Sequence, residues 1–71
     1  MTITVNGQPR EVPDGLTLAD LVGDHANGRG GRTTKGMAAA VDGAVAPRST
    51  WAEVVLHDGA VVEVLTAVQG G

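Results

Sequence analysis

The sequence has 71 residues, which is enough for one small domain and no more. It carries a formal net charge of -3, a single aromatic residue and no cysteine, so the core must be aliphatic and no disulfide can reinforce it. The few basic residues are scattered without aromatic residues between them, and no apolar stretch nears the ~18 residues of a membrane span, which argues against nucleic-acid and membrane binding.

The first residues predict a β-hairpin. Residues Thr2–Val5 alternate between polar and β-branched apolar side chains, as a half-buried strand does. Asn6-Gly7 follows, and both residues tolerate the positive φ angles of a type I′ turn. Residues 8–12 would form the returning strand, and Pro9, which has no N–H group, places that strand at an edge of the sheet.

A helix is predicted to begin near residue 17. Thr17 can cap it, with Asp20 three residues later completing an approximate capping box. We expect Gly23 to weaken or end this helix, with a frayed extension toward His25 as the alternative. The stripe that would dock the helix on a sheet consists of Leu18, Leu21 and Val22.

Residues 24–36 predict a flexible connecting loop because glycines alternate there with polar residues. A phosphate-binding loop is the competing interpretation. It requires a preceding strand and a Gly-Lys-Ser/Thr ending, whereas Gly36 follows Lys35 here. We therefore favour a plain loop.

The second half of the chain predicts short strands joined by tight turns. Asp42-Gly43 and 57–59 carry turn residues, and Ser49 is a candidate cap for one helical turn at 48–52. The predicted strands are 37–41, 44–46, 54–56 and 61–66. One helix on one face of a small sheet is the α+β solution for this order of elements.

A single helix leaves the opposite face of the sheet open. Strand alternation places Leu65 on that face, together with Val61 and Ala38. We expect these three residues to form a mostly apolar patch that binds a partner.

No catalytic or metal-binding pattern emerges. The two histidines, His25 and His57, lack ligand-like spacing, and His57 is interpreted as an exposed turn residue. Trp51 is interpreted as the anchor of a small core.

The most distinctive group is the α-carboxylate of Gly71, at the end of a Gly70-Gly71 tail that follows the last strand. Glycines without Cβ atoms can enter a narrow channel. An ionised carboxylate resists nucleophiles until it is activated, for example as an acyl adenylate. Because the chain has no cysteine, a sulfur carried as a thiol derivative would have to sit on this carboxylate. Chance or a cloning remnant would be the alternative origins of the two glycines.

Over essentially its whole length the chain resembles the sulfur carrier proteins of thiamin biosynthesis (the ThiS family), which are ubiquitin-like β-grasp proteins. The Pro47-Arg48-x-x-Trp51 element is the most discriminating, because other ubiquitin-like carriers share the terminal Gly-Gly. The segments that carry the resemblance are 3–7, 15–21, 45–51, 58–64 and 66–71.

The resemblance implies one ubiquitin-like domain over 1–71, with a globular body over 1–66 and a flexible tail over 67–71. It implies a small mixed sheet with one main helix on one face. It also implies a non-enzymatic carrier, monomeric when free, whose Gly71 is modified while Gly70 and Gln69 present it. A cytoplasmic protein is the expectation from the sequence itself, because residues 1–5 show no charged region followed by an apolar one, and the lack of cysteine fits that compartment.

The partners that the resemblance implies are an E1-like adenylating enzyme, which supplies ATP and magnesium, a cysteine desulfurase or sulfurtransferase, and thiazole synthase. Two alternatives remain open at this point. One is a sulfur carrier of another pathway, such as the small subunit of molybdopterin synthase, and the other is a β-grasp interaction module whose tail has no chemistry.

Overall fold

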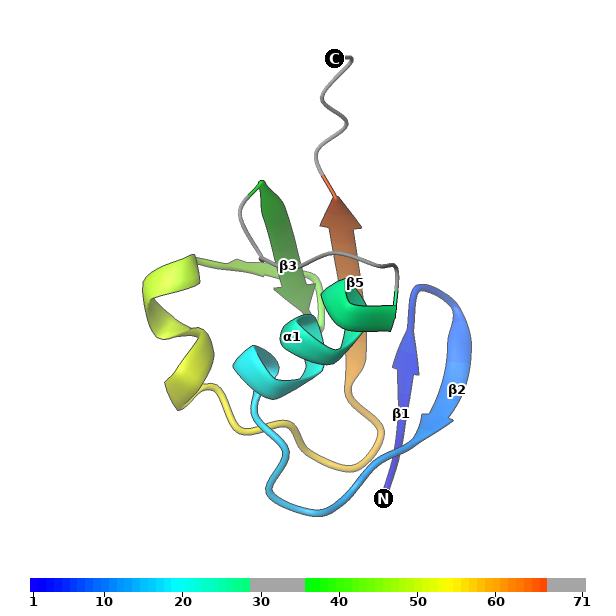
Figure 1. Ribbon diagram of the computed structural model, residues 1–71. Helices are drawn as coiled ribbons and strands as arrows, with labels where there is room; N and C mark the ends of the chain where they lie inside the picture. Colours follow the sequence, from blue (N-terminus) through cyan, green and yellow to red (C-terminus); the bar gives the residue numbers. More distant parts are fainter. Residues whose placement is uncertain (29–35, 67–71) are drawn as a thin grey trace.

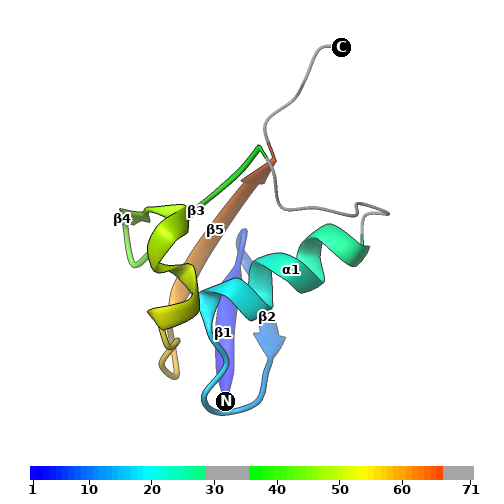
Figure 2. The same ribbon diagram turned by 60° about the vertical axis from the view of Figure 1, so that its left-hand side comes forward.

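The computed structural model describes residues 1–28 and 36–66, which form a five-stranded mixed sheet with one α-helix packed on one face (Figures 1 and 2). The strand order is β2-β1-β5-β3-β4, with β1 and β5 parallel and the other neighbouring pairs antiparallel. The elements are β1 (Thr2–Val5), β2 (Gln8–Glu11), α1 (Leu18–Gly28), β3 (Met37–Val41), β4 (Ala44–Ala46), the 3-10 helix η1 (Arg48–Glu53) and β5 (Val61–Thr66). The α+β prediction is confirmed.

Both predicted hairpins form. Asn6 and Asp42 have φ angles of 51° and 52°, and the glycines after them, Gly7 and Gly43, have 82° and 87°. Positive φ at two successive residues is the requirement of the type I′ turn that the sequence predicted. The strand that contains Pro9 lies at the edge of the sheet, as expected, and among the described strands it pairs with β1 alone.

The capping box at the start of α1 is present. The Asp20 N–H donates to Thr17 Oγ1 at 3.1 Å, and the Thr17 N–H donates to Asp20 Oδ2 at 3.3 Å. The helix then continues through Gly23 to Gly28, so the prediction that it ends at Gly23 is wrong, and it also passes His25, the limit of the expected frayed extension. A mid-helix glycine costs about 1 kcal/mol relative to alanine, which the docking of the apolar stripe outweighs. Residues 24–28 of the predicted loop are therefore helical, and 29–35 lie outside the described residues.

The core lies between α1 and the inner face of the sheet. The apolar stripe of α1, which consists of Leu18, Leu21 and Val22, is buried, and each side chain is at most 1% exposed. Trp51 is 4% exposed, and its indole Nε1–H donates to the Ala46 carbonyl at 2.8 Å, so the prediction that it anchors the core is confirmed. The buried core residues are Ile3, Val5, Val12, Leu18, Leu21, Val22, Met37, Ala39, Trp51, Leu56, Ala60, Val62 and Val64.

Two predictions for residues 48–56 are wrong. Ser49 does not cap η1, whose N-cap residue is Pro47 without a side-chain cap. The predicted strand 54–56 is reduced to a single bridge between Val55 and Thr17. Its potential partner, the segment that precedes α1, turns into the helix at Leu18, which leaves no further residues to pair with.

Candidate functional site

The face of the sheet that points away from α1 carries the three residues expected there. Leu65 is 65% exposed and Val61 47%, and Ala38 is also exposed. Their outward orientation is confirmed. We call this surface the open face, and it consists of Val61, Glu63 and Leu65 of β5, Ala38 and Ala40 of β3, and Val45 of β4.

Strand register brings most of these side chains together. Ala38 lies opposite Leu65, Ala40 lies opposite Glu63, and Ala40 also lies opposite Val45 on its other side. Val45 is 79% exposed and was not among the predicted partner residues. Counting back across the two-residue turn at Asp42-Gly43 would have revealed it, because such a turn places Val45 opposite Ala40.

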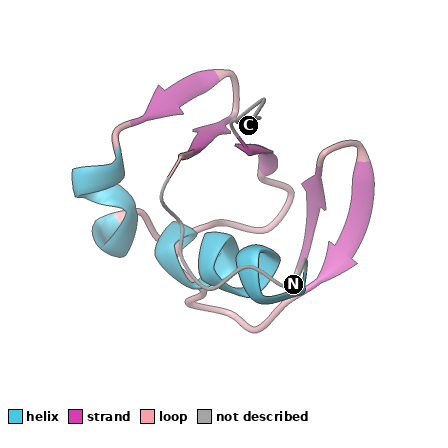
Figure 3. Ribbon diagram, turned by 45° about the horizontal axis from the view of Figure 1, so that its top comes forward, coloured by secondary structure: helices cyan, strands magenta, loops and turns pink. Residues whose placement is uncertain are grey.

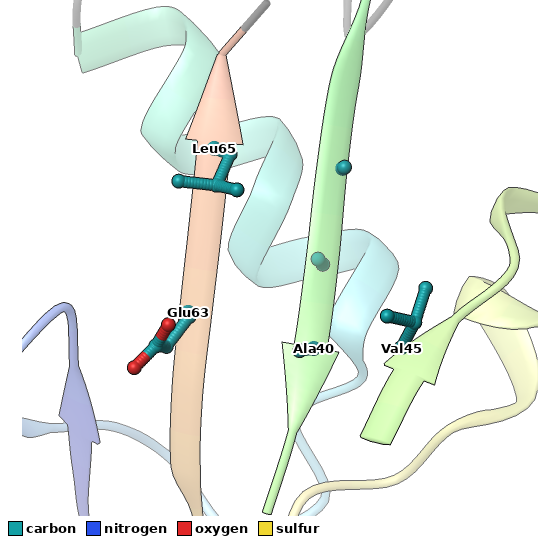
Figure 4. Close-up of a pocket in the computed structure, with 6 residues that line it drawn as sticks. Ala40, Val45, Glu63 and Leu65 are labelled. Carbon is teal, nitrogen blue, oxygen red and sulfur yellow. The ribbon is translucent and has the colours of Figure 1, made fainter. Parts of the chain in front are cut away.

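The open face is hollowed between its larger side chains. A depression of about 80 Å³ is lined by Ala38, Ala39, Ala40, Val45, Glu63 and Leu65. Figure 4 shows Leu65 and Val45 standing on either side of β3, whose alanines leave the space between them. Glu63 is the charged residue among those that line the depression, and Figure 4 shows its carboxylate on the side of β5 away from β3, so the hollow between Leu65 and Val45 is apolar.

The open face extends to the last described residues of the chain. Met37 pairs with Thr66, the C-terminal residue of β5, and Leu65 immediately precedes it. The remaining predicted site residues, Gln69, Gly70 and Gly71, lie outside the described residues. The strands are antiparallel, so β3 begins at this edge of the molecule beside the residue where β5 ends (Figure 3).

A second group of polar side chains lies where β5 begins. His57 is exposed, as expected for a turn residue, and it also makes two contacts. Its Nε2 lies 2.7 Å from Asp42 Oδ2, and its Nδ1 lies 2.9 Å from the Asp58 carbonyl oxygen. Both partners are acceptors, so both ring nitrogens donate only when the imidazole is protonated.

The hydrogen bond that His57 donates to Asp42 therefore raises the pKa of His57, with a smaller effect from the bond to the Asp58 carbonyl. The same bond lowers the pKa of Asp42, helped by the Val61 N–H, which donates to Asp42 Oδ1 at 2.9 Å. The pair joins the β3–β4 turn to the start of β5, at the opposite end of that strand from Thr66. The His57–Asp42 pair therefore has a structural role.

Other classes of site find no support in the part of the chain that the structure describes. Within residues 1–28 and 36–66, no three His, Asp or Glu side chains come together in a way that could hold a metal ion. The helices of these same segments are too short and too polar to cross a membrane.

Two hairpins joined through a parallel β1–β5 centre, with one helix across one face, define the ubiquitin-like β-grasp class. The sequence profile of the ThiS family matches residues 3–71. The chain belongs to the ThiS family, whose members are the small sulfur carrier proteins of thiamine biosynthesis.

Solved structures agree with this assignment. A crystal structure of the thiamine biosynthesis protein ThiS from Geobacter metallireducens is 26% identical, with a TM-score of 0.75 and complete coverage of both chains. An NMR solution structure of a thiamine biosynthesis protein from the same organism is also 26% identical, with a TM-score of 0.74, covering 100% of this chain and 88% of that one. Comparison with curated protein sequences gave no match. The resemblance and the β-grasp fold inferred from the sequence are thus confirmed.

Proposed function

We propose that this protein carries sulfur, as a thiocarboxylate on Gly71, for thiazole formation in thiamine biosynthesis. The observation that carries the proposal is the family match, which spans the body and continues through the Gly70-Gly71 ending. The absence of cysteine supports it, since no side chain of this protein could carry the sulfur as a thiol.

The proposed chemistry proceeds in two substitutions. A carboxylate oxygen of Gly71 attacks the α-phosphorus of ATP and expels pyrophosphate, which leaves an acyl adenylate. A sulfur nucleophile such as hydrosulfide then attacks the acyl carbon, and the C–O bond to AMP breaks as the C–S bond forms. ATP and magnesium belong to the activating enzyme in this scheme. The carrier contributes the carboxylate, which is ionised at neutral pH.

The proposal assigns catalysis to the partners. An E1-like enzyme adenylates Gly71, a cysteine desulfurase or sulfurtransferase supplies sulfur, and thiazole synthase receives it. Gly70 and Gly71 have no Cβ atoms, so these two residues are narrow enough to enter an active-site channel. Gln69 precedes them and completes the segment that presents the carboxylate.

Intact mass spectrometry tests this function. The purified protein is incubated with its cognate E1-like enzyme, magnesium-ATP and sodium sulfide. We expect a gain equal to one exchange of oxygen for sulfur, located on the C-terminal peptide, and no gain in a variant that lacks Gly71. If the unaltered protein shows no such species while the enzyme is demonstrably active, the chain is an interaction module without tail chemistry.

We further propose that the activating enzyme docks on the open face. This surface exposes Leu65 and Val45 beside an apolar hollow, and β5 leads from it directly toward the residues to be modified. Apolar patches of this kind mark partner surfaces, and Glu63 suits a partner surface that carries a basic group.

Leu65→Asp would place a charge in the centre of such an interface, so we expect the KM for the carrier to rise about tenfold or more. The measurement is ATP–pyrophosphate exchange catalysed by the activating enzyme. Val55→Asp is the matched control, because Val55 is 61% exposed and lies outside the open face. Equal KM values for the two folded variants would place the docking surface elsewhere.

A further inference from the structure

Asn6 is the first residue of the β1–β2 turn, and its side chain reaches across to β5. Its backbone N–H donates to the Val62 carbonyl at 2.9 Å. Its carboxamide makes two more bonds to the same strand: Oδ1 accepts from the Val64 N–H at 2.8 Å, and Nδ2 donates to the Val64 carbonyl at 3.2 Å. One side chain thus satisfies both backbone groups of a residue 58 positions away.

Val64 needs this partner because β1 has already ended. The last parallel pair is Val5 with Val62, and the chain turns away at Asn6. On the other side Val64 lies opposite Ala39, but its N–H and carbonyl point to Asn6, so this is a non-hydrogen-bonded position of the β3–β5 ladder. Val64 is 4% exposed, and unsatisfied backbone groups at such a position would be costly.

The carboxamide therefore takes the place of a strand residue that β1 does not supply. It extends the pairing on this side of β5 by two residues, from Val62 to Val64, and β5 ends two residues later at Thr66. β5 is consequently held from both sides almost to Thr66, its last residue.

The turn itself does not demand asparagine. Asp42 occupies the same position of the other type I′ turn with nearly the same φ angle, and glycine also adopts such angles. Among these three residues only asparagine offers both a donor and an acceptor, which is what the two groups of Val64 require.

We propose that Asn6 is a positioning residue for activation: by pairing with Val64 it fixes the direction in which β5 delivers the C-terminal residues to the adenylating enzyme. This inference rests on the proposed function. It differs from the docking proposal in its expected kinetics, because the side chains of the open face remain intact when Asn6 is changed.

The decisive variant is Asn6→Gly, which keeps the positive φ angle and removes only the carboxamide. Loss of two hydrogen bonds should loosen the end of β5, and we expect kcat for ATP–pyrophosphate exchange to fall roughly tenfold with little change in KM. Amide hydrogen exchange at Val64 should accelerate in parallel. Gly7→Ala is the matched control, because it strains the same turn at φ 82° and leaves the carboxamide in place.

Three outcomes would overturn the inference while the unaltered carrier is activated. These are an unchanged kcat in folded Asn6→Gly, a rise in KM alone, and an equal fall in kcat for Gly7→Ala. If Asn6→Gly does not fold, Asn6→Asp replaces it. Its carboxylate cannot donate to the Val64 carbonyl, so the protection of the Val64 amide, measured as the intrinsic exchange rate at each pH divided by the observed rate, should rise as the acid becomes protonated. Protection that does not change with pH would also overturn the inference. Failure to activate the unaltered carrier would instead refute the proposed function.

Discussion

The two Asx-Gly turns of this protein have almost the same backbone and hold β5 in different ways. Asn6 and Asp42 differ by one degree in φ, and each turns its side chain toward the backbone of β5. Asn6 holds the end of the strand from the β1 side, whereas Asp42 holds its start from the β3 side.

The difference follows from what each position leaves unpaired. At the start of β5, the Val61 carbonyl accepts from the Asp42 backbone N–H at 2.7 Å, so only the Val61 N–H needs the side chain. A carboxylate suffices there, and its second oxygen is left for His57. At Val64 both groups need the side chain, which requires an amide. Asn and Asp are about equally suited to the first position of these turns. They are not equally suited to the backbone groups of β5 that their side chains bind.

The largest difference in stability between the two turns should appear when Asn6 is replaced by Asp and Asp42 by Asn. Asn6→Asp directs a carboxylate at the Val64 carbonyl, and we expect a loss of about 2–3 kcal/mol in the free energy of unfolding at neutral pH. Asp42→Asn keeps an acceptor for the Val61 N–H, so its loss should be clearly smaller. Denaturant titrations at pH 7 measure both. Losses of equal size would show that the two side chains are interchangeable.

Changing the two glycines should show where the turns are alike. Gly7→Ala and Gly43→Ala each place a Cβ atom at a positive φ angle, and no atom beyond the adjoining residues of the chain lies within 4 Å of either added group. The cost is therefore backbone strain alone, about 1–2 kcal/mol in each variant. Thermal unfolding of the two proteins should give closely matching destabilisation. A clear inequality would mean that one turn tolerates strain through movement of its strands.

The smallest expected effect is on the pH dependence of stability, to which the turn at Asp42 should contribute and the turn at Asn6 should not. The raised pKa of His57 adds stability that is complete below its usual value of 6.5 and is lost as pH rises through the raised pKa. The lowered pKa of Asp42 adds stability that is present above 3.8 and is lost as pH falls through the lowered pKa.

The contribution of the pair is therefore greatest between about pH 4 and pH 6.5. His57→Gln should flatten the stability profile on the alkaline side of this window. Unfolding midpoints measured from pH 4 to pH 9 provide the test. An identical profile in the variant would show that His57 does not contribute to the pH dependence of stability. Asn6→Gly is the control and should leave the shape of the profile unchanged.

Local signals in the sequence predicted much of the fold. Asn6-Gly7 and Asp42-Gly43 specified their turns, and the capping box specified where α1 begins, because these features depend on neighbouring residues alone. The outward orientation of Leu65 followed from strand alternation.

Features that depend on tertiary packing escaped prediction. The helix persists beyond Gly23 because the sheet supports it, and 54–56 pairs only at Val55 because its neighbour becomes a helix. The role of Asn6 is the clearest case. Its partner lies 58 residues away, so the sequence indicates the turn and gives no sign of the bond to β5. Residues 67–71 remain a prediction from sequence and family.

The parallel pairing of β1 with β5 has a consequence for biosynthesis. β5 lies between β1 and β3, so before β5 is made the β1–β2 and β3–β4 hairpins have no strand to join them. The sheet can close only after β5 has been made, and pairing between segments so distant in sequence slows folding. Any carrier with a complete sheet has therefore been translated at least to Thr66, and truncated chains would present no assembled surface to an activating enzyme.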